Sequence, residues 1–250
     1  MSNKDAGWWD EFFPLFRPLF SIISDKETKA QTAYFIAKLN LKPGQKFLDC
    51  PCGIGRISIP MAKKGIIVTG VDITKSYLEE LDLQTRKKKL NVNTIHSDMR
   101  RINFTNEFHA AGNLWTSFGF FEKDSDNYLA LKKMFQALKP GGKFMLHVIN
   151  RDWVLANFAP YGWYKGKDFK ILEEREFDFS KSISRTKWYF MKKGEEKVLD
   201  SDIRMYSYHE LLNIFKKIGF INIEGFGSVD DDPISLNHRM MFIIGTKPEK

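Results

Sequence analysis

The chain has 250 residues, of which 43% are hydrophobic and 14% are aromatic, so it can bury a sizeable core and is not expected to be disordered. Its formal net charge of +8 would suit an RNA or an acidic membrane surface, but a moderate excess of Lys and Arg also simply keeps a protein in solution. No apolar run approaches the roughly eighteen residues of a membrane helix, and the first residues lack a signal-peptide pattern, so a cytoplasmic protein without a membrane partner is expected.

The two cysteines of the chain, Cys50 and Cys52, are too close together on a strand end to form an unstrained disulfide. They are spaced Cys-x-Cys, no second pair exists, and the five histidines are scattered along the chain. A zinc site is therefore not expected, and the sequence predicts no metal.

The first predicted helix begins at a Ser24-x-x-Glu27 capping box, carries apolar residues at helical spacing, and ends before Pro43. A strand KFLDC follows, then a glycine-containing loop, a helix RISIPMAKK that ends at Gly65, and a buried strand IIVTGVD. Strand, helix and strand in this order form a βαβ unit, which implies parallel strands joined by a right-handed crossover.

The alternation continues with a helix over residues 74–89, strands at NTIHSD and HAAGNLW, a helix over residues 124–138, and a strand KFMLHVIN after the turn KPGG. Near the C-terminus, a helix ELLNIFKKIGF capped by Ser207 precedes two strands, INIEGFG and MMFIIGTK, which are expected to pair antiparallel. The expected fold class is α/β, with a doubly wound sheet that helices cover on both faces.

The pattern of apolar and charged residues changes after Asn150. Between residues 169 and 206, apolar and charged residues alternate in short runs separated by Ser- and Gly-containing turns, which is typical of antiparallel strands. We therefore expect one domain made of residues 1–150 and 207–250, in which residues 151–206 are inserted as a β flap.

The stretch FLDCPCGIGR contains an acid, two cysteines and two glycines. A P-loop would need Gly-Lys-Ser/Thr where this chain has Arg56, and a dinucleotide fingerprint would need a third glycine in place of Ser58. A nucleophilic Cys52 would need a His or acid partner, and the sequence names none. What remains is Asp49 at a strand end, a tight Gly-x-Gly turn, and Asp72 closing the next strand, a spacing suited to ribose hydroxyls.

Four stretches in order, LDCPCGIGR, VTGVDIT, HSDMR and LKPGGKFMLHVIN, resemble the motifs of class I S-adenosylmethionine-dependent methyltransferases. The resemblance runs from about Leu41 to Asn150 and resumes from Ser207 to Lys247. It implies a Rossmann-like sheet of seven mostly parallel strands, whose antiparallel last strand lies between strands five and six. It also implies S-adenosylmethionine as the cofactor.

The resemblance places Asp72 on the ribose hydroxyls and Asp98 at the adenine amino group, and carboxylates suit both roles because they accept hydrogen bonds. Ile73 and Met99 would lie against the adenine, and the glycine loop would lie at the amino acid part of the cofactor. Asp72 as a helix cap and Asp98 as an Asx turn are the alternatives. The residues expected at the cofactor are Asp49, Cys52, Gly53, Gly55, Asp72, Ile73, Asp98, Met99, Leu114 and Trp115.

The motifs of enzymes that methylate adenine or cytosine bases are not found. The residues NLWT stand where adenine or glutamine methyltransferases have an Asn-Pro-Pro-aromatic motif, and both cysteines lie in the first motif rather than where a cytosine enzyme places its nucleophile. Nucleic acid is therefore not the expected partner.

Aromatic residues near the N-terminus and near residue 161 suit a closed pocket, so the expected reaction is methyl transfer to an amine or hydroxyl of a small molecule by in-line displacement. An RNA or protein methyltransferase that uses the basic surface stays open, as does a non-catalytic binding module on the same fold. The sequence names no general base and predicts no oligomeric state. Candidate residues of the substrate pocket are Trp9, Phe118, Arg151, Tyr161 and Trp163.

Overall fold

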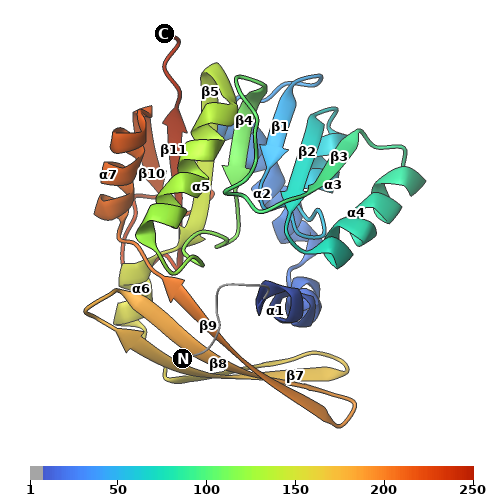
Figure 1. Ribbon diagram of the computed structural model, residues 1–250, viewed down its shortest axis with the longest axis vertical. Coiled ribbons are helices and arrows are strands. Elements are labelled where there is room, and N and C mark those ends of the chain that lie inside the picture. The colour runs from blue at the N-terminus through green and yellow to red at the C-terminus, as the bar shows by residue number, and fades with distance from the viewer. Residues whose placement is uncertain (1–7) are drawn as a thin grey trace.

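A computed structural model describes residues 8–250, so residues 1–7 of the predicted N-terminal cover lie outside the described part of the chain. Figure 1 shows a large sheet with helices on both faces and, beneath it, a separate antiparallel sheet. The large sheet has seven strands in the order β10-β11-β5-β4-β1-β2-β3, and the small sheet has four in the order β6-β7-β8-β9.

The strands of the large sheet are β1 (Lys46–Asp49), β2 (Ile67–Asp72), β3 (Val92–His96), β4 (Phe108–Asn113), β5 (Leu138–Ile149), β10 (Ile221–Phe226) and β11 (Met240–Thr246). Those of the small sheet are β6 (Tyr161–Lys165), β7 (Phe169–Asp178), β8 (Ile183–Lys192) and β9 (Glu195–Arg204). The helices are α1 (Trp8–Phe16), the 3-10 helix η1 (Arg17–Ile22), α2 (Asp25–Lys38), α3 (Ser58–Lys63), α4 (Lys75–Lys87), α5 (Asp124–Ala137), α6 (Arg151–Ala156) and α7 (Tyr208–Ile218).

Strand β1 shows how the large sheet is buried on both faces. Leu48 lies in one buried cluster with Met134 of α5 and Phe215 of α7, whereas Phe47 lies in a second cluster with Phe35 of α2. Neighbouring residues of a strand point to opposite faces, so a strand covered by helices on both sides is apolar throughout.

The strand directions confirm the predicted fold class. Strand β1 pairs parallel with β2 and with β4, and β4 pairs parallel with β5. Strand β11 pairs antiparallel with both β5 and β10, between which it lies. This is the doubly wound, Rossmann-like sheet with an antiparallel last strand that the resemblance implied.

The predicted helix starts are also found. Ser207 and Glu210 form a complete capping box at α7, which ends at Gly219 in the left-handed conformation with φ of 113°. At α2, the Ser24 side chain accepts a hydrogen bond from the backbone of Glu27. No helix within residues 8–250 is long and apolar enough to cross a membrane.

The inserted segment forms a sheet of four strands, one more than the alternation predicts. The additional strand is β6, which pairs antiparallel with β7. Its sequence, YGWYK, follows Pro160 and contains a glycine, and both features are typical of loops. Backbone pairing with β7 makes this segment a strand nonetheless, because an edge strand needs hydrogen bonds on one side only.

Helix α1 lies between the two sheets (Figure 1). Phe12 of α1 is 2% exposed and shares a buried cluster with Ile171, Trp188 and Phe190, which project from one face of the small sheet. We call this the inner face of the flap, and the opposite, solvent-facing side its outer face. The aromatic N-terminus thus fastens the flap to the large domain.

Candidate active site

The glycine loop follows β1 and brings the backbone close to the ends of two strands. The N–H of Cys52 donates to the carbonyl of Val71 at 2.9 Å, which ties the loop to β2. Gly53 and Gly55 have φ of 55° and 80°, and a Cβ at Gly55 would clash with the Leu81 side chain. Glycine suits both positions because it adopts positive φ without strain, and at Gly55 it also lets the loop pack closely against α4.

Asp72 closes β2 beside the glycine loop and is 6% exposed. One carboxylate oxygen accepts from the N–H of Gly53 at 2.7 Å, and the other accepts from the N–H of Thr74 at 2.8 Å. Burial raises the pKa of this carboxyl, while the two backbone donors oppose the rise. Asp72 therefore organises both the loop and the residue before α4, but it is not the N-cap of that helix, which is Thr74.

Asp49, at the end of β1, is 2% exposed and accepts a hydrogen bond of 2.6 Å from the Ser58 hydroxyl. Burial is the largest influence on this carboxyl and raises its pKa to about 7, although the Ser58 hydrogen bond and the charge of Arg56 act in the opposite direction. The side chain thus holds the start of α3 against the strand end. It reaches a ligand only through the loop that it supports.

The buried Asp49 carboxyl predicts that the protein loses stability as the pH rises. Its pKa is higher in the folded state than in the unfolded state, so folding is favoured at low pH and weakens as the pH rises through about 7. Between pH 5 and 7 we expect the free energy of unfolding to fall by about 2 kcal/mol in the wild type and to change less in Asp49→Asn. Urea unfolding of both proteins across this range checks it, and parallel pH curves would contradict it.

Asp98, just after β3, is paired with an arginine of its own turn. Arg100 donates through Nε and Nη2 to the Asp98 carboxylate, at distances down to 2.6 Å, and through Nη1 to Asp126 at 2.7 Å. The backbone N–H of Arg100 also donates to Asp98, which is the Asx-type turn considered as its alternative role. The neighbouring Met99 lies at the side chain of Asn113, with 3.6 Å between Sδ and Nδ2, so the third motif contacts β4.

The segment after β4 turns sharply over the glycine loop. Trp115 and Thr116 both have left-handed φ angles, 65° and 59°, and the N–H of Thr116 donates to His147 of β5 at 2.9 Å. The Trp115 ring stacks on Phe20 of η1 at 5.4 Å between centroids. Phe20 also meets Tyr77 of α4 edge-on at 5.7 Å, so η1 covers the ends of β1, β2 and β4.

Comparison with known proteins shows which family has a site of this kind. A model of the methyltransferase domain matches residues 47–142, which include the glycine loop, Asp72 and Asp98. The ubiquinone biosynthesis O-methyltransferase of Vibrio vulnificus is 30% identical over 181 residues, which are 70% of this chain and 71% of that enzyme. The enzyme of the same name from Coxiella burnetii is 28% identical over 86% of each chain. The chain belongs to the class I S-adenosylmethionine-dependent methyltransferases.

Solved structures with the same fold include a methyltransferase from Clostridium acetobutylicum, with a TM-score of 0.79, 16% identity, and coverage of 97% of this chain and 100% of that one. The sugar N-methyltransferase KedS8 of Streptoalloteichus has a TM-score of 0.70 and 15% identity, and the match covers 100% of this chain and 96% of that one. The likeness in fold therefore extends over the flap as well as the large sheet. The methyltransferase is an enzyme, and S-adenosylmethionine is its cofactor.

Two residues at the strand ends, Asp72 and Gly53, have free hydrogen-bond acceptors or open space that suit this cofactor. Each oxygen of a carboxylate can accept two hydrogen bonds, and the structure uses one on each oxygen of Asp72. One acceptor position per oxygen is left for the two ribose hydroxyls. A Cβ added to Gly53 would have one neighbour within 4 Å, the Phe20 ring at 3.8 Å, so there is open space beside this residue.

Most of the predicted cofactor residues lie together along one edge of the sheet. Asp49 and Asp72 end β1 and β2, Asp98 follows β3, and Leu114 and Trp115 follow β4. The family resemblance implies that these residues hold the cofactor, and their individual contacts stay predictions. Cys52 is buried in the methyltransferase, as is Cys50, and burial raises the pKa of both thiols, which disfavours a nucleophilic role.

The predicted substrate residues of the methyltransferase are spread more widely. Phe118 is 4% exposed, with its ring 5.0 Å from that of Tyr206. Arg151 pairs with Asp152 at 2.7 Å and with Glu210 at 3.2 Å, which is the ion-pair role considered as its alternative. Trp9 is half-buried on α1.

Tyr161 and Trp163 lie on β6 but on the outer face of the flap, where they are 73% and 66% exposed. Their neighbour Tyr164 points to the inner face and joins the cluster around Phe12. The expected pocket role does not suit the positions of Tyr161 and Trp163, because side chains alternate along a strand and theirs point away from the large domain. Tyr164, an aromatic residue of the same stretch that is not among the five candidates, is the residue of β6 that packs on the inner face of the flap.

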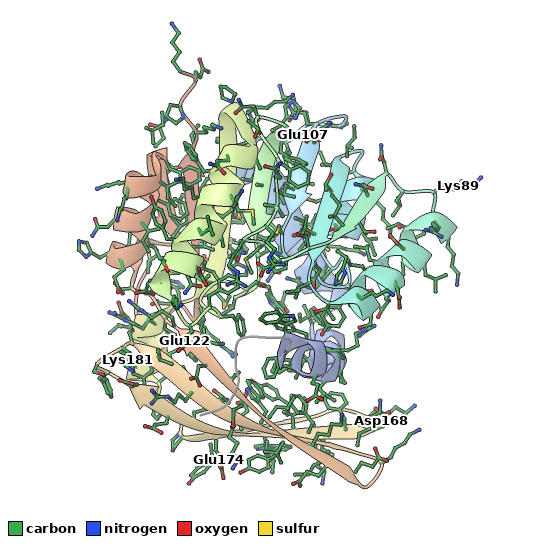
Figure 2. All side chains as sticks on the ribbon, viewed as in Figure 1. Lys89, Glu107, Glu122, Asp168, Glu174 and Lys181 are labelled. Carbon is green, nitrogen blue, oxygen red and sulfur yellow. The ribbon has the colours of Figure 1, made fainter. Side chains whose placement is uncertain are left out.

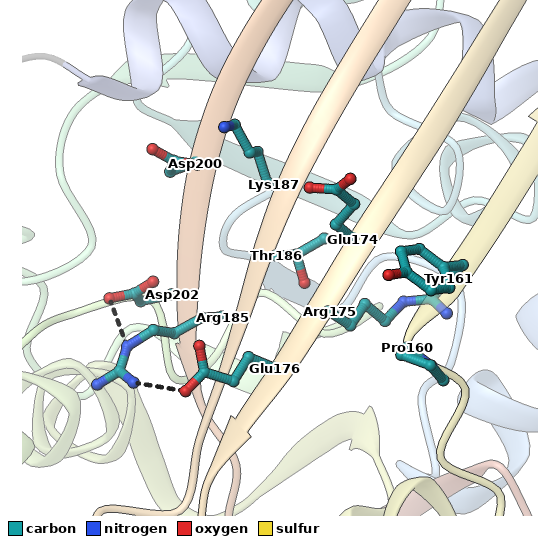
Figure 3. Close-up of a pocket in the computed structure, with 10 residues that line it drawn as sticks. All are labelled: Pro160, Tyr161, Glu174, Arg175, Glu176, Arg185, Thr186, Lys187, Asp200 and Asp202. Carbon is teal, nitrogen blue, oxygen red and sulfur yellow. Dashed lines mark ion pairs between the residues drawn. The ribbon is translucent and has the colours of Figure 1, made fainter.

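The outer face carries a groove of about 540 Å³ that is lined by residues of the flap and by Pro160 (Figure 3). Glu174 on this face points away from the large domain in Figure 2. Arg185 in the groove is surrounded by acids, with Asp178 at 2.8 Å, Glu176 at 3.8 Å and Asp202 at 4.0 Å. The charge of Arg185 is therefore paired within the small sheet. Among residues 8–250 there is no group of three His, Cys, Asp or Glu placed to hold a metal.

Proposed function

We propose that this methyltransferase acts on an amine or hydroxyl group of a small molecule, and that the N-terminal helices and residues 151–206 cover the site. On this proposal, residues 1–150 and 207–250 form the catalytic domain and the flap forms the substrate cover. The observation that carries it is the packing of α1 and η1 between the inner face of the flap and the strand ends.

The cover is continuous from the flap to the cofactor edge. Phe16 packs edge-on against Trp188 of the flap at 4.6 Å, and Phe13 packs edge-on against Phe120, in the loop after β4, at 5.7 Å. The Tyr77 hydroxyl donates to the carbonyl of Phe13, which ties α4 to the same helix. A roof of this kind suits a small acceptor, whereas a folded macromolecule would need an open edge.

S-adenosylmethionine supplies a methyl group on a positively charged sulfur. The chain has to align the acceptor with that methyl and exclude water from it, and neither task needs a strong acid or base. The rings of Phe20, Tyr77 and Trp115 exclude water on the roofed side of the glycine loop. Hydroxyl and amine acceptors both agree with the proteins that this chain resembles, a ubiquinone biosynthesis O-methyltransferase in sequence and a sugar N-methyltransferase in fold.

The buried, unpaired cysteines agree with a reducing compartment, so we also infer a cytoplasmic location. This inference concerns the place of action and does not depend on which acceptor is methylated.

The test is an acceptor screen that measures release of S-adenosylhomocysteine from the full chain. Panels of primary amines and amino sugars, of hydroxylated aromatic compounds, and of RNA and protein substrates are compared with a reaction lacking acceptor. Asp72→Ala is the matched inactive control. Turnover with a small molecule supports the proposal. Turnover only with RNA or protein supports a methyltransferase that acts on macromolecules. No turnover in the presence of bound cofactor supports a non-catalytic binding module.

The proposal also predicts weak binding to nucleic acid. The +8 charge is expected to act as a dispersed surface charge, so affinity for tRNA or duplex DNA should fall steeply between about 50 and 200 mM salt. Fluorescence anisotropy with labelled tRNA at the two salt concentrations measures this. Tight binding that survives 200 mM salt would favour an RNA methyltransferase.

A further inference from the structure

We propose that Arg56 binds the carboxylate of the methionine part of S-adenosylmethionine. The inference rests on the family membership of the chain and is independent of which acceptor is methylated. Sequence reasoning used Arg56 only to exclude a P-loop, and the predicted cofactor residues do not include it.

The first observation is an unused hydrogen-bond donor inside the protein. Nη1 of Arg56 donates to Gln31 at 2.8 Å and lies 3.5 Å from the Thr28 hydroxyl, both on α2. Nη2 is buried and has no hydrogen-bond partner among the described residues. Burial is the largest influence on the guanidinium and lowers its pKa, while the charges of Glu27 and Asp49 act in the opposite direction.

A buried charge without a partner is costly, and proteins commonly retain one where a ligand completes it. Four other arginines of the described chain show the usual alternative. Arg17, Arg100, Arg151 and Arg204 each have a carboxylate within 2.7 Å of the guanidinium. Arg56 instead donates to the neutral side chains of Gln31 and Thr28, and Glu27 and Asp49 act on it only through their charge. A carboxylate that accepts from Nη2 would complete its hydrogen bonds.

The second observation is the position of Arg56. It directly follows Gly55 in the loop that the family resemblance places at the amino acid part of the cofactor. Its guanidinium lies over the Trp115 ring, 5.1 Å from the centroid, so it spans from the glycine loop to the segment after β4. A ligand lying between these two segments would meet the planar donor edge of Arg56.

Charge complementarity identifies which part of the cofactor Arg56 meets. Asp49, Asp72 and Asp98 at the strand ends are acids, which suit hydroxyl, amino and cationic groups. The carboxylate of S-adenosylmethionine needs a donor instead. Arg100 is already held by Asp98 and Asp126, which leaves Arg56 as the available cation among these residues.

The experiment compares two ligands by calorimetry: S-adenosylmethionine, and its decarboxylated form, which lacks only the carboxylate. We expect the wild type to bind the complete cofactor about 10- to 100-fold more tightly than the decarboxylated form, as for a charge-assisted pair. In Arg56→Met the complete cofactor should lose most of this advantage, while affinity for the decarboxylated form changes less than about threefold. Arg56→Lys should restore part of the preference, because it keeps the charge but not the planar donor pair.

Two controls separate this role from a structural one. Arg185→Met removes an arginine from the outer face of the flap and should leave both affinities unchanged. Asp72→Ala should weaken both ligands equally, because both contain the ribose, so failure of the Arg56 proposal is distinguishable from failure of the cofactor assignment.

Three outcomes would overturn the proposal. Equal affinity of the wild type for both ligands would do so even if Arg56→Met failed to fold. An equal loss of both ligands in Arg56→Met would show that Arg56 only supports the loop and α2. A raised acceptor KM with unchanged cofactor affinity would assign Arg56 to the acceptor.

Discussion

Replacing Asp72 with alanine lowers the affinity for S-adenosylmethionine by about a hundredfold or more. The carboxylate is expected to accept one hydrogen bond from each ribose hydroxyl, and hydrogen bonds to a charged group contribute about 1.5 to 3 kcal/mol each. The variant also removes the acceptor that holds the N–H groups of Gly53 and Thr74. Calorimetric titration of both proteins with the cofactor measures the effect.

Thermal unfolding has to accompany that titration, since Asp72 also supports the loop. Asp72→Asn is the milder variant, because it keeps the shape and one acceptor oxygen, and its affinity should fall between those of the other two proteins. Asp231→Ala is a matched control, as Asp231 is an acid that pairs with Lys38 at 2.7 Å away from the strand ends. Equal cofactor affinity of Asp72→Ala and the wild type would remove the ribose assignment.

Replacing residues 161–204 with a short Gly-Ser linker lowers methyl transfer to the acceptor by more than about a hundredfold, while cofactor affinity stays within about tenfold of the wild type. Ligands of open α/β sheets bind outside the carboxyl ends of the strands, and the flap is joined to α1, which lies over that edge. Losing the cover admits water and removes the surface that aligns the acceptor. Cofactor titration and turnover are measured separately on the same preparation.

Neighbouring residues of β6 provide a gentler test of the flap. Tyr164→Ala changes the inner face and should lower kcat/KM for the acceptor by about tenfold or more, since Tyr164 packs beside Phe12. Trp163→Ala changes the outer face, where the side chain is 66% exposed, and should leave kcat/KM within about twofold. Equal effects of the two substitutions would contradict the assignment of the inner face to the substrate.

The sequence predicted the sheet and the edge that carries the site. Apolar strands alternated with capped helices, and the acids Asp49, Asp72 and Asp98 each came at or just after a predicted strand end. Parallel strands have their carboxyl ends at one edge, so residues of this kind are brought together by topology alone. That is why the strand-end set could be named before any coordinates.

The sequence could not predict which side chains of the flap point toward the large domain. Alternation shows that Trp163 and Tyr164 face opposite sides of a strand, but both are aromatic, so the pattern does not say which one faces inward. The packing of α1 decides it, because Tyr164 contacts the cluster that contains Phe12. Strand β6 itself was missed because its stability comes from pairing with β7 and not from its own composition.

The sequence also could not predict which residues pair with the charged side chains of the site. Asp98 was expected at the adenine, and the structure shows both of its oxygens engaged by Arg100. Arg56 gave no signal in the sequence, since an arginine after a glycine turn is usually solvated. Its significance comes from the burial of Nη2 without a hydrogen-bond partner, which only coordinates reveal.

A crystal structure of the full chain with S-adenosylhomocysteine tests the central claim most directly. We expect the ligand at the strand ends beneath η1, with its ribose hydroxyls within hydrogen-bond distance of Asp72 and its carboxylate on Arg56. Density for the ligand in the groove on the outer face of the flap, or at the strand ends with the ribose away from Asp72, would contradict it.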